Sequence, residues 1–379
     1  MPGERIYLDH NATTPLDPEV LEAMLPFLRE GFGNPSSLHW FGQRARAAVE
    51  EARAQVASLV GAEPPEIVFT GGGSESDNAA LRGVAARARP PRLGIVCSAV
   101  EHHAVLNVAK ALRDEGRPVE VARVGEDGVL DLADLAAKVG ETTALVSIML
   151  ANNETGVLQP VPEASRLARA GGALVHCDAV QGAGKVGIDV RQLDVDLLSL
   201  SAHKLYGPKG VGALYVRRGT PLVALVRGGA QERNRRAGTE NVPGVVGFGV
   251  AAGIALRRRV EDAARLAALR DRLEERLLGI EGARRNGGNP RVPNTTNVSF
   301  EGVDAEALLI ALDLEGIAVS TGAACAAGGV EPSHVLRAMG LPPERVQSSL
   351  RLSLGRGTTE AEVLRAADVI AAVVARQRR

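Results

Sequence analysis

The sequence is short of cysteine and of long apolar runs, and each shortage excludes a class of protein. Only three cysteines occur among 379 residues, at positions 97, 177 and 325, too few and too widely spaced for a disulfide framework or a cysteine zinc site. No apolar run is long enough to cross a bilayer, and the N-terminal residues contain no apolar segment of a signal peptide. We therefore expect a cytoplasmic protein, because free thiols are typical of a reducing compartment.

An excess of charge of either sign is also missing. The formal net charge is −1, so there is no electrostatic reason to expect a nucleic acid or an anionic membrane as partner. Arginine carries most of the positive charge, and lysine occurs only at positions 110, 138, 185, 204 and 209. Only these few side chains could form a Schiff base with a carbonyl compound.

The order of the apolar segments predicts the fold class. Short apolar runs alternate with amphipathic stretches as far as residue 201, which indicates a mostly parallel sheet covered by helices on both faces, an α/β fold. A long helix is predicted over 244–280, followed by a break rich in Gly, Pro and Asn and by a smaller α+β pattern. We expect a large domain over 13–256 and a small domain over 257–379 that includes 1–12. Strands are expected at 66–70, 93–98, 144–150, 173–178, 195–201, 296–300, 317–320 and 348–354, and the other helices at 42–59, 76–88, 103–115, 162–170, 304–314 and 359–377.

The segment FTGGGSESDNAA, residues 69–80, is a candidate anion site. It has the pattern of a strand, a glycine-rich turn and a helix, and the N–H groups at a helix N-terminus attract phosphate. Ser74 is predicted to be the N-cap residue of that helix. The segment lacks the Gly-Lys-Ser/Thr of a P-loop and does not fit GxGxxG, and an ordinary turn with a capping serine is the commoner meaning of such a run.

Asp178 and Lys204 follow two predicted strands of the sheet. One βαβ-sized connection separates them, so we expect neighbouring strands and both side chains at the same edge of the sheet. Asp178 could pair with a cationic ring nitrogen, or it could simply cap the following turn. Lys204 alone among the lysines is placed where burial could lower its pKa for imine chemistry. A carboxylate, a Schiff-base lysine and a phosphate turn together are far more specific than any one of them.

Cys325 is the candidate reactive thiol. Cys97 and Cys177 lie inside predicted strands and fit the usual behaviour of a cysteine as a small buried apolar residue. Cys325 lies in a loop rich in Ala and Gly, from which a thiol could reach both an active site and a partner. A chance cysteine in a surface loop is the alternative.

Two further clusters have both a functional and an ordinary interpretation. His102, after a predicted strand, could stack on an aromatic cofactor, or it could be an N-cap or surface histidine. The segment QERNRRAGTEN, residues 231–241, concentrates arginines near Thr239 and suits an anion or a subunit contact, although most charge clusters are solvated faces.

Together these motifs resemble one enzyme family. In chain order, from residue 7 to about 356, they are YLDHNATTP, FGNPSSLHWFG, FTGGGSESDN, ANNETG, HCDAVQGAGK, SAHKLYGPKG, GGAQERNRRAGTEN, ACAAGGVEPSHVLRAMG and SSLRLSLGR. The chain is similar to the cysteine desulfurases dependent on pyridoxal phosphate (PLP), within the fold-type I, class V aminotransferase superfamily. Its Cys325 loop resembles the branch that serves nitrogen fixation and housekeeping iron–sulfur assembly. It departs from the family pattern at His10, where Asn is expected, and at Ser74, where Thr is more usual.

The resemblance implies a role for each motif residue. Lys204 would hold PLP as a Schiff base and act as general base, Asp178 would keep the ring nitrogen protonated, and Gln181 would hydrogen-bond the phenolic oxygen of the ring. His102 would stack on the ring and shuttle a proton. The phosphate of PLP would be bound by Gly73, Ser74, Ser201 and His203, with Thr239 from the other subunit of a homodimer. The substrate would be oriented by Arg351, Asn34 and Asn153, and Asn153 would also contact PLP.

The implied reaction removes sulfur from L-cysteine. It would give L-alanine and a persulfide on Cys325, which a sulfur-acceptor protein would take for iron–sulfur cluster assembly, tRNA thiolation or another thio-cofactor. A selenocysteine lyase or a related class V aminotransferase is the alternative, and neither would need Cys325. A non-catalytic dimeric scaffold with the same fold is a third possibility, against which the intact Lys204 argues.

Overall fold

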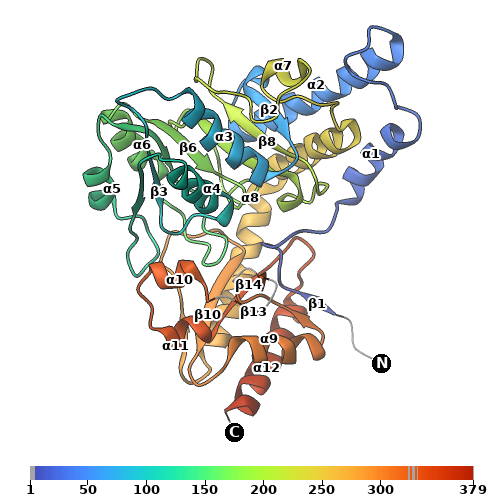
Figure 1. The fold of residues 1–379 in the computed structure, drawn as a ribbon. Helices are drawn as coiled ribbons and strands as arrows, with labels where there is room; N and C mark the ends of the chain where they lie inside the picture. Colours follow the sequence, from blue (N-terminus) through green and yellow to red (C-terminus); the bar gives the residue numbers. More distant parts are fainter. Residues whose placement is uncertain (1–4, 323–324, 327–328, 331, 379) are drawn as a thin grey trace.

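The computed structural model describes residues 5–322, 325–326, 329–330 and 332–378, with only the backbone described at 325–326 and 329–330. A large sheet flanked by helices forms one end of the molecule, and the C-terminal strands and helices form the other (Figure 1). The long helix α8 (Val242–Leu278) runs from one part into the other. None of the described helices combines the length and the apolar character that a membrane span requires.

The large sheet has the strand order β2-β8-β7-β6-β5-β3-β4. Strand β8 runs antiparallel to both of its neighbours and the remaining pairs are parallel, which confirms the predicted α/β class. Strands β6 and β7 are neighbours, as predicted, with Asp178 opposite Ser199. The strands are β2 (Ile67–Thr70), β3 (Gly94–Ser98), β4 (Val119–Ala122), β5 (Thr143–Ser147), β6 (Leu174–Asp178), β7 (Leu197–Ser201) and β8 (Gly212–Val216).

Both faces of this sheet are covered, because successive strand residues point to opposite sides. Phe69 and Val96 belong to the core shared with α2, α6 and α8, whereas Val68 and Ile95 belong to the core shared with α3 and α4. The helices around the sheet are α1 (Pro18–Arg29), α2 (Trp40–Val60), α3 (Gly73–Arg87), α4 (His103–Asp114), α5 (Leu132–Lys138) and α6 (Val161–Ala170).

Helix α8 packs closely against α2. A Cβ atom added at Gly249 would lie 2.6 Å from Cα and Cβ of Ala52, a distance that real side chains do not adopt. The two helix backbones can therefore approach only because residue 249 has no side chain. Beyond this contact α8 continues into the C-terminal part, where Leu273 and Leu277 are fully buried.

The C-terminal part has a core of its own that includes the first described residues. Ile6 and Leu8 pack there, because β1 (Ile6–Tyr7) pairs in parallel with β11 (Ile317–Ala318). Strand β10 (Thr295–Phe300) pairs with β14 (Ser349–Ser353) in a register that sets Arg351 opposite Asn297. The other elements are β9 (Ala283–Arg285), α9 (Ala305–Leu314), β12 (Cys325–Ala326), β13 (Gly329–Val330), α10 (His334–Ala338), α11 (Pro343–Gln347) and α12 (Glu360–Gln377).

A buried ion pair holds the strained helix α7 (Gln231–Asn234) against the sheet. Glu232, Arg233 and Asn234 all have positive φ angles, of 46°, 57° and 63°. The Arg53 guanidinium donates to both Glu232 oxygens, at 2.7 and 2.8 Å, and the N–H of Phe69 donates to Oε2 at 2.9 Å. Left-handed residues without glycine are costly, so this pair compensates for the local strain.

We predict that Arg53→Met lowers the free energy of unfolding of the apoprotein by about 3–5 kcal/mol, because it leaves the Glu232 carboxylate buried without a cation. The measurement is urea denaturation at fixed protein concentration. Arg191→Met is the matched control, since the Arg191–Glu63 pair is exposed on both sides and should contribute at most about 1 kcal/mol. Equal losses in the two variants would contradict the prediction.

Candidate active site

A cavity of about 430 Å³ lies where β6 and β7 end, beside the N-terminus of α3. Segments distant in sequence also line it, among them residues 9, 11–12, 320, 322 and 351. The cavity brings together most of the site residues predicted from the sequence. These are Gly73, Ser74, His102, Asn153, Asp178, Gln181, Ser201, His203, Lys204 and Arg351.

Lys204 is held in the cavity wall by the N-terminal segment. It ends the short helix η2 (Ala202–Lys204), which directly follows β7. Its Nζ donates to the main-chain oxygens of Asn11 and Ala12, both at 2.6 Å. Among the described residues, Lys204 is the one lysine that lines this cavity.

The surroundings of Lys204 make its amine unusually easy to deprotonate. Burial lowers the pKa of Lys204 to about 8, helped by the Arg351 cation and opposed by Asp9 and Asp178. Roughly a tenth of the amine is therefore unprotonated at pH 7, far more than for an exposed lysine. An unprotonated amine is what condensation with a carbonyl group requires.

The prediction that Lys204 alone has a lowered pKa is wrong. Burial also lowers the pKa of Lys185 well below its ordinary value, as do the cations Lys204 and Arg351. Its Nζ donates to Oδ1 of Asn11 at 2.9 Å and to Oε1 of Gln181 at 2.8 Å. Lys185 does not line the large cavity, so its position does not suit Schiff-base chemistry there.

Asp178 both caps a turn and lines the cavity. Its Oδ1 accepts the Val180 N–H at 2.9 Å, so the turn-capping interpretation is confirmed. Burial raises the pKa of Asp178 to about 6, against the opposing effects of the Val180 N–H and the Lys204 cation. A cationic ring nitrogen beside this carboxylate would favour its ionised form.

A row of buried polar groups lies next to Asp178. His176 bonds Oγ of Ser147 through Nδ1 at 2.8 Å and Oγ of Ser199 through Nε2 at 2.9 Å. Oδ1 of Asp77 lies 3.6 Å from the same Nε2. Burial lowers the pKa of His176 to about 3, so its imidazole is neutral near pH 7, and burial also raises the pKa of Asp77 well above its usual range.

The N-terminus of α3 faces the cavity without a side-chain cap. The helix begins at Gly73 and its N-cap residue is Gly72, so the prediction of Ser74 as N-cap is wrong. A Cβ atom at Gly73 would lie 2.8 Å from Cγ2 of Val180, so glycine lets the helix end approach the turn after β6. Uncapped N–H groups and the hydroxyls of Ser74 and Ser201 form a cradle for an anion.

His102 is the N-cap residue of α4, which confirms that interpretation. Its Nδ1 accepts the Ala104 N–H at 3.1 Å. The ring also lines the cavity, so the capping role does not remove it from the site. Burial lowers its pKa to about 4, together with Lys204 and His103, and the imidazole is therefore neutral near pH 7.

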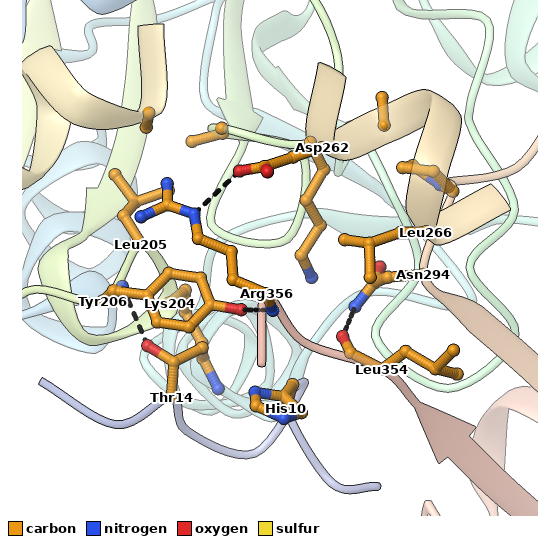
Figure 2. A pocket seen from close by; sticks show the side chains of 16 residues that line it. His10, Thr14, Lys204, Leu205, Tyr206, Asp262, Leu266, Asn294, Leu354 and Arg356 are labelled. Carbon is orange, nitrogen blue, oxygen red and sulfur yellow. Dashed lines mark hydrogen bonds and ion pairs between the residues drawn. The ribbon is translucent and has the colours of Figure 1, made fainter. Parts of the chain in front are cut away.

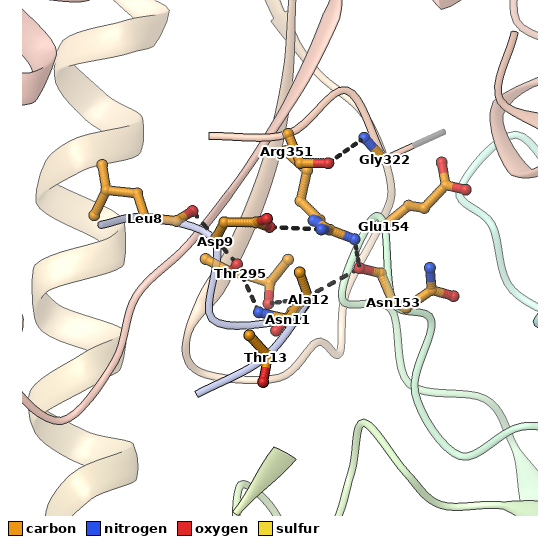
Figure 3. A network of polar contacts seen from close by, with 12 residues as sticks. Leu8, Asp9, Asn11, Ala12, Thr13, Asn153, Glu154, Thr295, Gly322 and Arg351 are labelled. Atoms are coloured by element: carbon orange, nitrogen blue, oxygen red, sulfur yellow. Dashed lines mark hydrogen bonds and ion pairs between the residues drawn. The ribbon is translucent and has the colours of Figure 1, made fainter. Parts of the chain in front are cut away.

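Arg351 is placed by contacts from two distant segments, as Figure 3 shows. Its Nη2 donates to Oδ1 of Asp9 at 2.6 Å and its Nη1 donates to the Asn153 main-chain oxygen at 3.1 Å. Nε of Arg351 and Oδ1 of Asn153 are buried, and neither has a hydrogen-bond partner within the described structure. Buried polar atoms of this kind normally bind something, and here both belong to residues that line the cavity.

A second, smaller cavity of about 40 Å³ also has Lys204 in its wall, together with His10 and Tyr206 (Figure 2). Lys185 lines this cavity too. The imidazole of His10 packs against residue 355, where a Cβ atom would lie only 2.0 Å from Cε1. The unusual histidine at position 10 is therefore accommodated by a glycine far along the chain.

Asn34 and Thr239, two predicted site residues, do not line the large cavity in this chain, and the prediction for Cys325 falls on a side chain outside the described residues. Asn34 is exposed in the connection between α1 and α2, where its Oδ1 accepts the Ser36 N–H. Thr239 is exposed. The backbone of Cys325 pairs with Val330 in the β12–β13 hairpin, and its side chain lies outside the described part of the structure. Cys97 and Cys177 are fully buried, as predicted, and burial raises the pKa of both thiols.

Several residues in the cavity wall were assigned no role from the sequence: Asp9, Asn11, Asp77, Glu154 and His334. Each lies in one of the quoted motifs, and that membership was the available signal. Their partners are remote in sequence, since 342 positions separate Asp9 from Arg351. Burial raises the pKa of Glu154 to about 7, and its Oε2 accepts the Ser333 hydroxyl at 2.5 Å.

Comparison with known proteins gives matches over nearly the whole chain. Residues 6–365 match the family model described as aminotransferase class-V. A protein named cysteine desulfurase from Trichormus azollae is 49% identical over 98% of this chain and 94% of its own length. One named cysteine desulfurase IscS, from Anaeromyxobacter sp. (strain Fw109-5), is 52% identical over 94% of this chain and 89% of its own length.

Solved structures agree with the sequence matches. A structure titled NifS-like protein has a TM-score of 0.93 and 40% identity, covering 98% of this chain and 99% of its own. The structure titled "SspA in complex with cysteine" has a TM-score of 0.82 and 35% identity, covering 92% of this chain and 98% of its own. The chain therefore belongs to the class-V aminotransferase family of PLP-dependent enzymes.

Proposed function

We propose that the chain is a cysteine desulfurase, which takes sulfur from L-cysteine, releases L-alanine and carries the sulfur as a persulfide on Cys325. One observation supports this most strongly. The amine of Lys204, the carboxylate of Asp178 and the guanidinium of Arg351 line a single cavity, in a chain about half identical to proteins named cysteine desulfurase. The relatives described above share that name, so the selenocysteine lyase or aminotransferase alternative is not favoured.

The residues of the cavity fit PLP. An amine with a lowered pKa, an uncapped helix N-terminus and a carboxylate at a strand end match its aldehyde, its phosphate and its ring nitrogen. We assign these roles to Lys204, to the start of α3 and to Asp178, respectively. Bound PLP supplies an electron sink for the electron pair that forms at the α-carbon of an amino acid.

The other cofactor contacts are assigned by the same logic. Gln181 would donate an N–H to the phenolic oxygen of the ring, and His102, whose imidazole is neutral near pH 7, would stack on the ring. Asn153 also lines the cavity, and its buried Oδ1, which has no partner in the described structure, is assigned to contact the cofactor. The phosphate would be held by Gly73, Ser74, Ser201 and His203, which line the cavity. Thr239 from the partner subunit of a homodimer is assigned to the same phosphate.

Arg351 and Lys204 orient and deprotonate the substrate. The guanidinium grips the carboxylate of L-cysteine, for which its partnerless Nε is an available donor, and Asn153 and Asn34 help to orient it. Lys204 then takes the α-proton as general base, since its pKa near 8 lets it hold and return a proton near neutral pH.

Cys325 is the nucleophile for the sulfur. Its thiolate attacks the substrate sulfur, so that an S–S bond forms and the substrate C–S bond breaks. The electron pair of that bond stays with the substrate carbon, which takes a proton and becomes the methyl group of alanine. His102 lies in the same cavity and is assigned to carry protons between the sulfur and the reacting carbon.

We propose the same two domains that the sequence suggested, 13–256 and 257–379 with 1–12. The separate core around Leu8, Leu273 and Phe300 supports this division. We also propose a homodimer in the cytoplasm that passes its sulfur to an acceptor protein, for iron–sulfur cluster assembly or another thiolation pathway.

The first test of this function is Cys325→Ala. We expect alanine formation from cysteine to fall at least about a hundred-fold, because no thiolate remains to take the sulfur. Cofactor absorbance should persist, since Lys204 is unchanged. Cys97→Ala, in the buried β3 strand, is the matched control and should keep its activity. Unchanged alanine production by Cys325→Ala would contradict the persulfide mechanism.

The pH dependence of cofactor loading tests Lys204. Only the unprotonated amine can condense with the aldehyde of PLP, and burial lowers the Lys204 pKa to about 8. The loading rate of the apoprotein should therefore rise with pH up to about 8 and then level off. The rate at which free N-acetyl-lysine condenses with PLP, measured in parallel by absorbance, should still be rising with pH above 8. A protein curve that follows that of the free amine would be inconsistent with a lowered pKa.

Arg351→Lys tests the carboxylate grip. A single ammonium cannot reproduce bidentate binding, so the KM for cysteine should rise roughly ten- to a hundred-fold, the equivalent of one charge-assisted hydrogen bond. Arg345→Lys is the control, because Arg345 bonds Asn286 and Arg285 outside the cavity. An unchanged KM in Arg351→Lys would argue that another group binds the carboxylate.

A further inference from the structure

Lys185 touches the active site from outside the cavity. It lies on the turn that follows β6, four residues after Gln181, and lines the small cavity described above. Its Nζ donates to Oε1 of Gln181 at 2.8 Å and to Oδ1 of Asn11 at 2.9 Å. One amine therefore binds the oxygen ends of two side-chain amides.

The amine of Lys185 and the main-chain oxygen of Asn11 together determine which way the Gln181 amide points. The two ends of a glutamine amide differ only in being an acceptor and a donor, and partners decide between them. If the N–H end of the Gln181 amide faced Lys185, it would meet the N–H groups of the Lys185 amine. The oxygen end of the amide therefore faces Lys185. Nε2 consequently lies on the other side, where it donates to the main-chain oxygen of Asn11 at 2.9 Å.

The same Asn11 oxygen also accepts Nζ of Lys204 at 2.6 Å. A continuous set of hydrogen bonds thus joins Lys185, Gln181, Asn11 and Lys204. The side-chain oxygen of Asn11 is oriented in the same way, because Lys185 and the amide of Asn294 both donate to it. Each amide in this set is held at both ends.

We propose that Lys185 is a positioning residue, which fixes the Gln181 amide with its N–H groups toward the cavity so that one of them can donate to the phenolic oxygen of the cofactor. The proposal rests on the cofactor role of Gln181 stated under the proposed function. Of the two N–H groups on Nε2, one binds Asn11 and the second remains for the ring oxygen.

The charges around Lys185 do not alter this geometry. Lys204 and Arg351 are the cations that add to burial in lowering its pKa, and the nearby His10 is itself kept neutral by burial and by Lys185. An amine that has lost one proton still has two N–H groups, one for each amide oxygen. The orientation of Gln181 is therefore the same with a charged or a neutral Lys185.

Loss of this orientation has a spectroscopic consequence. A donor on the phenolic oxygen stabilises the negative charge there and weakens the hold of that oxygen on the neighbouring imine proton. Without the donor, the imine proton is held more tightly, and the pKa seen in the absorbance of the bound cofactor rises. One charge-assisted hydrogen bond corresponds to a rise of about one unit.

The test is a double-mutant cycle on the cofactor-bound protein without substrate. Lys185→Met, Gln181→Leu and the double variant are each titrated by cofactor absorbance. We expect both single variants to raise the pKa and the double variant to match Gln181→Leu alone, because Lys185 acts through Gln181. Shifts that add in the double variant, or no shift in Lys185→Met, would overturn the proposal.

Two further variants separate positioning from a general loss of structure. Lys185→Arg keeps a donor-only head group and should titrate like the unchanged protein. If Lys185→Met does not retain cofactor, Lys185→Gln takes its place in the cycle. We then expect a smaller rise of the cofactor pKa, and again no additional shift when it is combined with Gln181→Leu. The titration needs no turnover of substrate. A protein that binds PLP but does not desulfurate cysteine would contradict the proposed function, and the double-mutant cycle would still test the role of Lys185.

Discussion

The active site depends on the main-chain oxygen of Asn11, which accepts hydrogen bonds from the side chains of both Lys204 and Gln181. Asn11 is almost completely buried, so its own polar atoms must all find partners in the protein. Its N–H binds Ser353 and its Nδ2 binds Thr295. One residue near the N-terminus therefore connects the end of the large sheet to strands of the C-terminal part.

The cavity brings together charged groups whose side chains are largely buried, and this burial explains their shifted pKa values. Burial disfavours ionisation of every group, so it lowers the pKa of Lys204 and raises that of Asp178, and both shifts bring the groups toward neutral pH. Arg351 stays paired with Asp9 at 2.6 Å. Under the proposed function, a phosphate, a cationic ring nitrogen and an amino-acid carboxylate are the complementary charges for this cavity.

Much of the site was predictable because strand ends and helix starts are local features. The alternation of apolar runs placed Asp178 and Lys204 after adjacent strands, and the structure pairs those strands with Asp178 opposite Ser199. The Ser74 cap was not predictable, because Gly73 is needed for a close approach to Val180, a contact made across the fold. Strand β8 was missed because it returns antiparallel soon after Lys204, with the short helix η2 rather than a full crossover helix between it and β7.

The sequence by itself determined the fold class and the main chemical groups of the site, because apolar periodicity and motif spacing are local properties of the sequence. Only the tertiary structure decided which remote residues complete the site. Asp9 and Arg351 are 342 positions apart, and Asn11 meets Lys185 and Lys204 through its oxygens after more than 170 residues of intervening chain. These contacts follow from the pairing of β1 with β11 and from the burial of polar groups that must be satisfied, neither of which a local pattern encodes.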